Sequence, residues 1–277
     1  GLLDERFIDR EGFTLLAYAS VTDSTSVVRH VLTEIDSIPD ISLKLQQVRA
    51  RFPDHGVVSL GITGRMTSLM GAMIASRPEI VSLLLEYGAD PLSKDIRGID
   101  CLQFASAFGN TENVKFWLNR FPDWDLEARN TVVGGIALGC AVFMGPNRLK
   151  LTSLLLNHGA KIDTVTDTGS SILISACKNI DADPRVVKLL LKSLQHQVNY
   201  RRRATTMKWK SIRMIAKTSV RAMSNPGMLM KLLAEEAGGT ALHESVRRGD
   251  LEIVEVCLIL YLFLPICIYK HSNIIQI

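Results

Sequence analysis

The stretch that decides the fold lies between Gly64 and Asp90 and reads GRMTSLMGAMIASRPEIVSLLLEYGAD. When it is moved along the chain so that Gly64 meets Arg97, a shift of 33 residues, it falls on RGIDCLQFASAFGNTENVKFWLNRFPD. Leu69 then coincides with Leu102, and Ala72 with Ala105. A period of this length predicts a helical repeat protein, in which each unit buries its apolar side against its neighbours.

A four-residue motif begins each copy. Its first residue is Thr, Ser or Asp in most copies and predicts the N-cap of a short helix. Its third residue is Leu in six of the seven copies, and an Ala two residues beyond the end of the motif in six copies predicts close helix packing. The copies begin at Thr14, Thr67, Asp100, Ile136, Ser171, Ser211 and Thr240.

A second helix follows in each copy. It reads EIVSLLL at 79–85, LTSLLL at 151–156 and RVVKLLL at 185–191, with apolar residues at positions i, i+3 and i+4. Gly88 and Gly159 stand where a helix end favours a left-handed residue, and Asp90 and Asp163 follow as turn formers. The pattern predicts pairs of helices joined by exposed hairpins, and so an all-α fold.

These motifs resemble the ankyrin repeat, whose consensus carries Gly-x-Thr-Pro-Leu-His-x-Ala, a Leu run and a Gly-Ala-Asp exit. The resemblance implies an all-α ankyrin-repeat solenoid of stacked helix-turn-helix units with short hairpin connections and about seven repeats, several degenerate. The expected division is a lead-in (1–8), repeat 1 (9–41), an insertion or eroded repeat (42–61), repeats 2 to 5 (62–94, 95–130, 131–165 and 166–205), a degenerate repeat 6 (206–234), a truncated repeat 7 (235–260) and an apolar tail (261–277).

Charge is distributed unevenly along the chain. The total is 32 basic and 28 acidic residues, but residues 184–234 hold twelve Lys and Arg and no Asp or Glu. The remainder therefore holds 32 − 12 = 20 basic against 28 acidic residues. For Arg201, Arg202, Arg203, Lys208, Trp209 and Lys210 three interpretations stay open: a solvated hairpin, an acidic protein partner, and a phosphate-bearing partner such as nucleic acid or anionic lipid. Of the partners, we expect an acidic protein before nucleic acid.

Neither the cysteines nor the histidines form a recognisable site. The five Cys are scattered, never in a CxxC pair, and the six His are not spaced as metal ligands. We therefore expect no cofactor, no metal and no disulfide framework, which fits a reducing compartment. Residues 1–10 lack an apolar leader region. A cytoplasmic location is expected, with the nucleus as an alternative.

No catalytic motif stands out, so the chain is not expected to be an enzyme. The resemblance implies a monomeric scaffold that binds a protein partner through hairpin tips and inner helices. The alternative is a regulatory region of a larger enzyme or membrane-tethered protein, the latter through residues 253–269. The remaining expected contact residues, by position in the repeat, are Met70, Asp90, Lys94, Asp95, Arg97, Gln103, Glu127, Arg129, Asp163, Asp167 and Met214.

Overall fold

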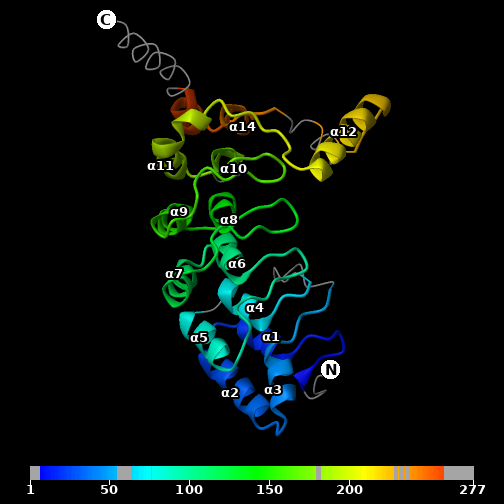
Figure 1. Cartoon of the computed structure of the whole chain (residues 1–277), viewed down its shortest axis with the longest axis vertical. Helices are drawn as coiled ribbons and strands as arrows, with labels where there is room; N and C mark the ends of the chain where they lie inside the picture. The colour runs from blue at the N-terminus through cyan, green and yellow to red at the C-terminus, as the bar shows by residue number, and fades with distance from the viewer. Residues whose placement is uncertain are drawn as a thin grey trace, which may run out of the picture.

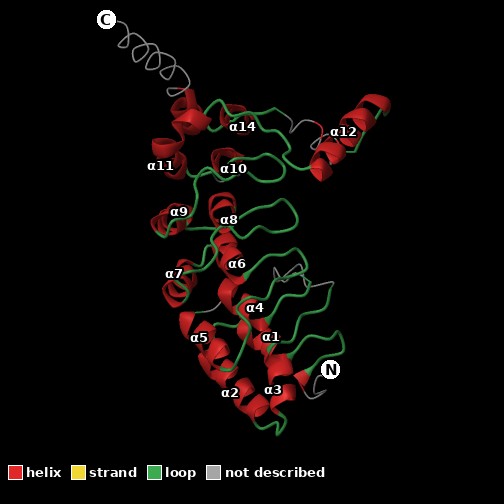
Figure 2. Ribbon diagram, in the orientation of Figure 1, coloured by secondary structure: helices red, strands yellow, loops and turns green. Residues whose placement is uncertain are grey.

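The computed structural model describes residues 7–54, 64–75, 77–178, 182–227, 230, 234 and 238–258. Within these ranges the chain is helical and holds no strand, only three isolated antiparallel bridges (Figure 2). The prediction of an all-α chain is confirmed. The helices are α1 (Leu15–Ser20), α2 (Thr25–Asp36), α3 (Ile41–Val48), α4 (Ser68–Ala75), α5 (Pro78–Glu86), α6 (Cys101–Phe108), α7 (Thr111–Arg120), α8 (Ala137–Phe143), α9 (Arg148–Asn157), α10 (Ile172–Lys178), α11 (Pro184–Leu194), η3 (Gln195–Gln197), α12 (Met207–Ala222) and α14 (Ala241–Arg248), followed by a helical segment at 251–258.

The helices form two rows (Figure 1). In the inner row α1, α4, α6, α8, α10 and α14 contact one another in that order, and in the outer row α2, α5, α7, α9 and α11 do the same. Each of these outer helices also packs on the inner helix that precedes it in the chain. Loops extend from the inner row toward the side opposite the outer row (Figure 1). The result is an elongated stack of helix pairs.

The motif residues occupy the positions that their chemistry predicts. The third-place leucines Leu16, Leu69, Leu102, Leu138 and Leu173 are all buried, and so are the alanines that follow them. Thr14 and Asp100 accept the amide hydrogens of Ala17 and Gln103 and so cap their helices. Thr240 and His243 form a reciprocal capping box at α14, so His243 has a structural role at the start of this helix.

The sixth copy differs from the expectation. Ser211 does not begin a helix but lies inside α12, and α10 contacts α14 directly. Across the gap the Arg202 amide donates to the Gly239 carbonyl, and the Gly238 amide donates to the Arg202 carbonyl. Residues 203–237 are therefore inserted at a hairpin tip. The described chain stacks six helix pairs and not seven, and the copy that does not stack has Arg213 where the other copies carry Leu.

The extra length between Thr14 and Thr67 has two sources. The helix α3 packs beside α2, while α1 and α4 remain direct neighbours in the inner row. The next hairpin is closed at its base, where the Phe52 amide donates to the Met66 carbonyl; its residues 55–63 lie outside the described part. Of the two alternatives for 42–61, the insertion fits this arrangement, because α3 adds no unit to the inner row.

The apolar end of the chain falls mostly outside the described residues, which stop at Leu258. The expected tail (261–277) and most of the 253–269 segment lie outside the described residues. Among the residues that are described, no helix has the length and apolar character needed to cross a bilayer.

Candidate binding face on the hairpins

Backbone hydrogen bonds join the loops of neighbouring helix pairs. The Ile96 amide donates to the Gly64 carbonyl at 3.1 Å, and the Thr131 amide to the Arg97 carbonyl at 2.8 Å. In the next two loops the Asp167 amide donates to the Val133 carbonyl at 2.7 Å, and the Thr205 amide donates to the Asp167 carbonyl at 3.0 Å. We call the surface formed by loop residues 90–99, 124–135, 160–170 and 201–205 the hairpin face. Because each tip is bonded to the next, the whole face is pre-ordered, which lowers the entropy cost of binding.

Arginine side chains reinforce the same connections. The Arg51 guanidinium donates to the carbonyl of Lys94, one loop further along, at 2.5 Å. Arg129 donates to the Val165 carbonyl at 2.7 Å and pairs with the Asp167 carboxylate at 3.1 Å. Planar guanidinium groups suit this role because their several donors span two acceptors at once.

Three glycines allow the loops to approach so closely. Gly98, Gly134 and Gly169 all have positive φ angles, a conformation that side chains disfavour. A Cβ at Gly134 would lie 2.4 Å from the Asp167 carboxylate, and one at Gly169 would lie 1.9 Å from the Arg203 carbonyl oxygen. The spacing of the hairpin face therefore depends on these positions.

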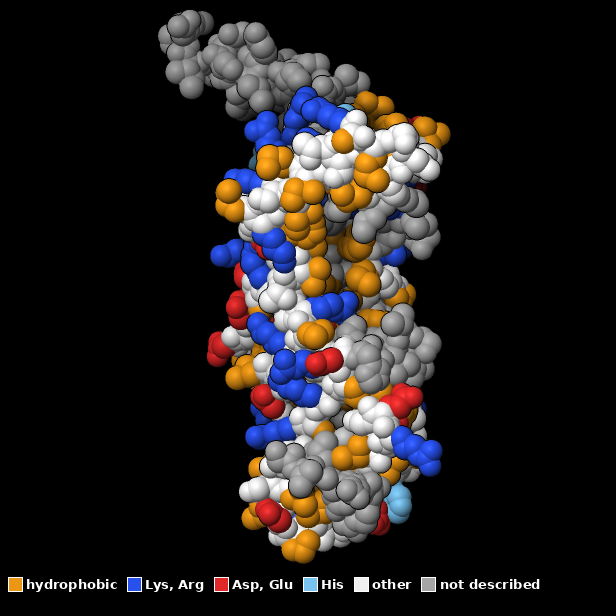
Figure 3. Space-filling model, turned by 90° about the vertical axis from the view of Figure 1, so that its right-hand side faces the viewer, with side chains coloured by type: hydrophobic (Ala, Val, Ile, Leu, Met, Phe, Trp, Pro, Cys, Tyr) orange, Lys and Arg blue, Asp and Glu red, His pale blue; other side chains and the backbone are white. Residues whose placement is uncertain are grey.

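The hairpin face exposes large apolar side chains. Leu92 is 72% exposed, Ile96 52% and Val132 42%. Exposed Lys94 and Arg129 lie on the same two loops. In Figure 3, which faces these loops, apolar and basic side chains lie side by side along the stack. Sequence reasoning missed the three apolar residues. For Leu92 and Ile96 the signal was an apolar residue within a turn rich in charged residues, at 90–97.

Four of the expected contact residues are buried, so those predictions are wrong. Met70 lies inside the core. The Gln103 amide group donates to the carbonyls of Ala128 and Gly135, at 2.7 and 3.2 Å, and so holds the next loop. Asp95 accepts the amide hydrogens of Arg97 and Ile99 within its own turn. Arg202 donates to the Thr168 hydroxyl at 3.4 Å. Position in the repeat did not reveal that these side chains are buried within the protein, three of them in internal hydrogen bonds.

Other expected contact residues are half-buried and engaged in internal bonds. Asp90 accepts from the Leu92 amide and the Ser93 hydroxyl, and Arg97 pairs with Asp95 at 3.2 Å. Glu127 accepts from the Lys161 amide and the Thr164 hydroxyl, and Asp167 pairs with Arg129. These bonds lie within and between the loops, so the four side chains stabilise the loop conformations.

The remaining expected contact residues lie either on the hairpin face or on α12. Lys94, Arg129, Asp163, Arg201 and Arg203 are exposed on the hairpin face. Lys208, Lys210 and Met214 are exposed on α12, where Trp209 is half-buried. Met214 is thus not on an inner helix, because α12 lies outside the inner row. The predicted basic cluster is split by the buried side chain of Arg202.

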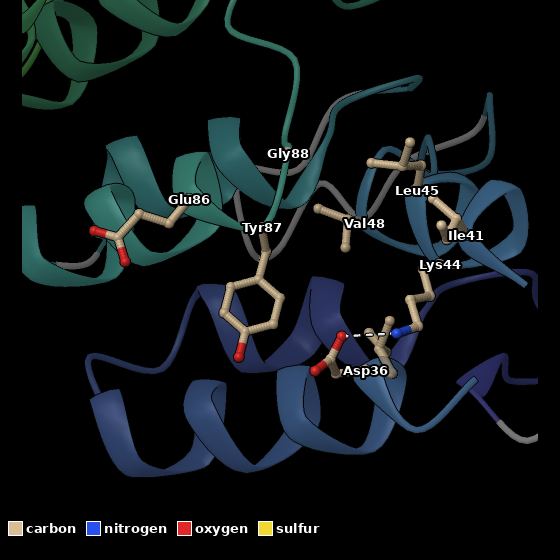
Figure 4. A pocket seen from close by; sticks show the side chains of 9 residues that line it. Asp36, Ile41, Lys44, Leu45, Val48, Glu86, Tyr87 and Gly88 are labelled. Atoms are coloured by element: carbon tan, nitrogen blue, oxygen red, sulfur yellow. Dashed lines mark hydrogen bonds and ion pairs between the residues drawn. The ribbon is translucent and has the colours of Figure 1, made fainter. Parts of the chain in front are cut away.

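A separate pocket opens between α2, α3 and the end of α5 (Figure 4). Its volume is about 410 Å³, within the range of small-ligand sites. Ile41, Leu45 and Val48 supply apolar walls, and the Lys44 ammonium pairs with the Asp36 carboxylate at 2.9 Å. Tyr87 faces the same space (Figure 4). The lining contains no paired carboxylates and no nucleophile beside a base, so it shows no catalytic arrangement.

Several buried groups, Asp100 and Cys177 among them, have shifted pKa values. Burial raises the pKa of Asp100 to about 6, although its carboxylate accepts the Gln103 amide at 2.8 Å. The thiols of Cys177 and Cys257, far apart in sequence, share a hydrogen bond between α10 and the last helical segment. This bond, with burial, raises the pKa of Cys177. Among the described residues, no group of three His, Cys, Asp or Glu is placed to hold a metal ion.

The fold and its surface thus define an all-α stack of helix pairs with a pre-ordered row of loops. No known family profile matches the chain. Among curated proteins it is similar to the phosphocholine transferase AnkX of Legionella pneumophila, with 30% identity over 143 residues. The match covers 50% of this chain but only 15% of that relative.

Proposed function

We propose that the chain is an ankyrin-type solenoid that acts as a non-catalytic scaffold and binds a protein partner through the hairpin face. The observation that carries the proposal is the continuous bonded row of loops with Leu92, Ile96 and Val132 exposed on it. An ordered surface that combines exposed apolar anchors with arginine is typical of protein-protein interfaces. The thirty-three-residue period and the buried motif leucines support the ankyrin assignment.

The binding contribution is expected to come from the apolar tips. Burying a side chain of this size stabilises a complex by about 1.5–3 kcal/mol. Exposed Lys94, Arg129, Arg201 and Arg203 add positive charge to the same face and favour a partner with acidic groups around an apolar centre. Rim charges act mainly on association rate and specificity.

The test is affinity capture from extract with the full chain as bait. The variant Leu92→Ser/Ile96→Ser/Val132→Ser should lose the captured partner, because its apolar anchors are gone. The matched control is Val27→Ser/Ile41→Ser/Leu251→Ser, which changes three comparably exposed apolar residues away from the hairpin face. Equal capture by both triple variants would contradict the proposal.

A second candidate is that the chain is the regulatory region of a larger enzyme. The similarity to part of a phosphocholine transferase favours it. This chain would then position a substrate or partner for a catalytic segment elsewhere. Incubation with an activated, labelled phosphocholine donor and a mixture of proteins should give no transfer with this chain alone. Labelling that depends on this chain would sink the non-catalytic proposal, and sequencing of the complete transcript would decide whether a catalytic segment exists.

A further inference from the structure

The helix α12 carries positive charge and no negative charge. Its sequence, MKWKSIRMIAKTSVRA, contains five basic residues, and no Asp or Glu occurs anywhere in 184–234. Lys208, Lys210, Lys217 and Arg221 are exposed. Such a helix attracts an anionic surface, whatever else that surface contains.

One side of α12 is attached to the stack. Arg213 is buried and donates a hydrogen bond to the Thr168 carbonyl in the preceding loop. Ala216, three residues further on and so on the same side, is also buried. Figure 1 shows α12 beside the end of the stack, apart from both helix rows. The attachment fixes which side of α12 faces outward.

The outward side combines apolar and basic residues. Met207 and Met214 are seven residues apart, two helical turns, and are 73% and 64% exposed; Ile215 beside them is 55% exposed. At 3.6 residues per turn, Lys210, Lys217 and Arg221 fall on one flank of this stripe, and Lys208 falls on the other. The apolar stripe is thus bordered by cations on both sides.

We propose that α12 docks the protein on an anionic membrane surface. Met207, Met214 and Ile215 would enter the boundary between headgroups and acyl chains, while the flanking lysines extend toward lipid phosphates. This inference goes beyond the proposed protein-binding role, because it uses a separate element and a different class of partner.

The geometry favours a lipid surface over an acidic protein groove. A protein groove that binds an amphipathic helix takes apolar anchors at positions i, i+3, i+4 and i+7. Between Met207 and Met214 these positions hold Lys210 and Ser211, so α12 offers such a groove no continuous row of anchors. A flat surface needs only the outward side, and cations on both flanks of a narrow apolar stripe suit a plane of anionic headgroups.

The test is flotation of the full chain with vesicles of phosphatidylcholine alone or with 30% phosphatidylserine. We expect binding to the anionic vesicles that weakens as salt is added. The variant Lys208→Gln/Lys210→Gln/Lys217→Gln/Arg221→Gln should bind them up to about 600-fold more weakly, since each of the four cations near such a surface contributes roughly fivefold. The variant Met207→Ser/Met214→Ser should also bind more weakly, with its charge intact.

A charge-matched control is Arg29→Gln/Lys115→Gln/Lys161→Gln/Lys192→Gln, which removes four exposed cations elsewhere. It should bind like the unaltered chain, and circular dichroism should show all variants folded. Equal binding to neutral vesicles, absence of binding to anionic ones, or equal losses in the control and α12 variants would each overturn the proposal. So would α12-dependent binding of soluble polyglutamate without vesicle binding, which would point to an acidic protein partner instead.

Discussion

Asp100 caps a helix, but its buried carboxylate is also costly to ionise. It caps α6 from a buried position, and burial raises its pKa from 3.8 to about 6. Because the folded pKa is the higher one, the folded state binds the proton more tightly than the unfolded state does. The contribution of this group to stability is therefore largest below pH 3.8 and is lost as pH rises through about 6.

Replacing Asp100 by Asn should keep the cap acceptor and remove this pH dependence. The free energy of unfolding of Asp100→Asn, relative to the unaltered chain, should rise by about 1 kcal/mol between pH 5 and pH 7.5. Urea unfolding at both pH values measures it, with exposed Asp163→Asn as the control. A difference that stays constant with pH would show that Asp100 is not the titrating group.

Gly169 is predicted to be the least replaceable loop glycine. Its φ is +83°, and a Cβ there would lie 1.9 Å from the Arg203 carbonyl oxygen. Gly159 has a similar φ of +91° with nothing within 4 Å of a Cβ. Gly159→Ala should cost roughly 1 kcal/mol for the left-handed backbone alone. Gly169→Ala should cost at least about 2 kcal/mol more, because a loop must also move. Thermal unfolding compares the two, and equal costs would disprove close loop contact.

At the scale of elements, the insertion 203–237 places α12 outside both helix rows. The backbone pairing of Arg202 with Gly238 and Gly239 closes the insertion at its base. The sequence pattern alone did not show this, because Ser211 and Ala216 match the repeat motif by residue type. What excluded a stacked helix pair in the sixth copy is the direct packing of α10 against α14.

Deleting 206–236 and joining Thr205 to Ala237 should therefore leave the stack folded. Four residues would connect the paired Arg202 and Gly238, a common hairpin length. Helical content should fall only by the contribution of the removed segment, and urea unfolding should stay cooperative. A chain that no longer folds would mean that α12 is part of the core; Arg213, which bonds to Thr168, would then be its main anchor.

At the scale of the whole molecule, each helix pair contacts mainly its neighbours, and stability is the sum of local units and their interfaces. Ile253 and Leu138 are both fully buried, but Ile253 lies in the last described helix and Leu138 in the middle of the inner row. The position of a cavity in the stack should therefore decide how many neighbouring helices it destabilises.

Both Ile253→Ala and Leu138→Ala should cost about 2–5 kcal/mol locally. Hydrogen exchange should accelerate only within 240–258 for Ile253→Ala, whereas Leu138→Ala should accelerate it on both sides of α8. If Ile253→Ala accelerated exchange equally at α6 and α14, the molecule would unfold as one unit and the neighbour-only description would fail.

The sequence by itself determined the helical class, the period and the residues that face the core, because burial of Leu and Ala depends on spacing along one helix pair. It also determined the caps at Thr14, Asp100 and Thr240, which act within one turn. Only the tertiary structure decided which polar residues remain for a partner. Gln103, Asp95 and Arg202 have the chemistry of surface contacts, but their bonds reach across turns and neighbouring loops, and no local pattern records such distances. The placement of α12 beside the stack was decided in the same way, by one hairpin closing across 35 residues and by the direct packing of α10 against α14.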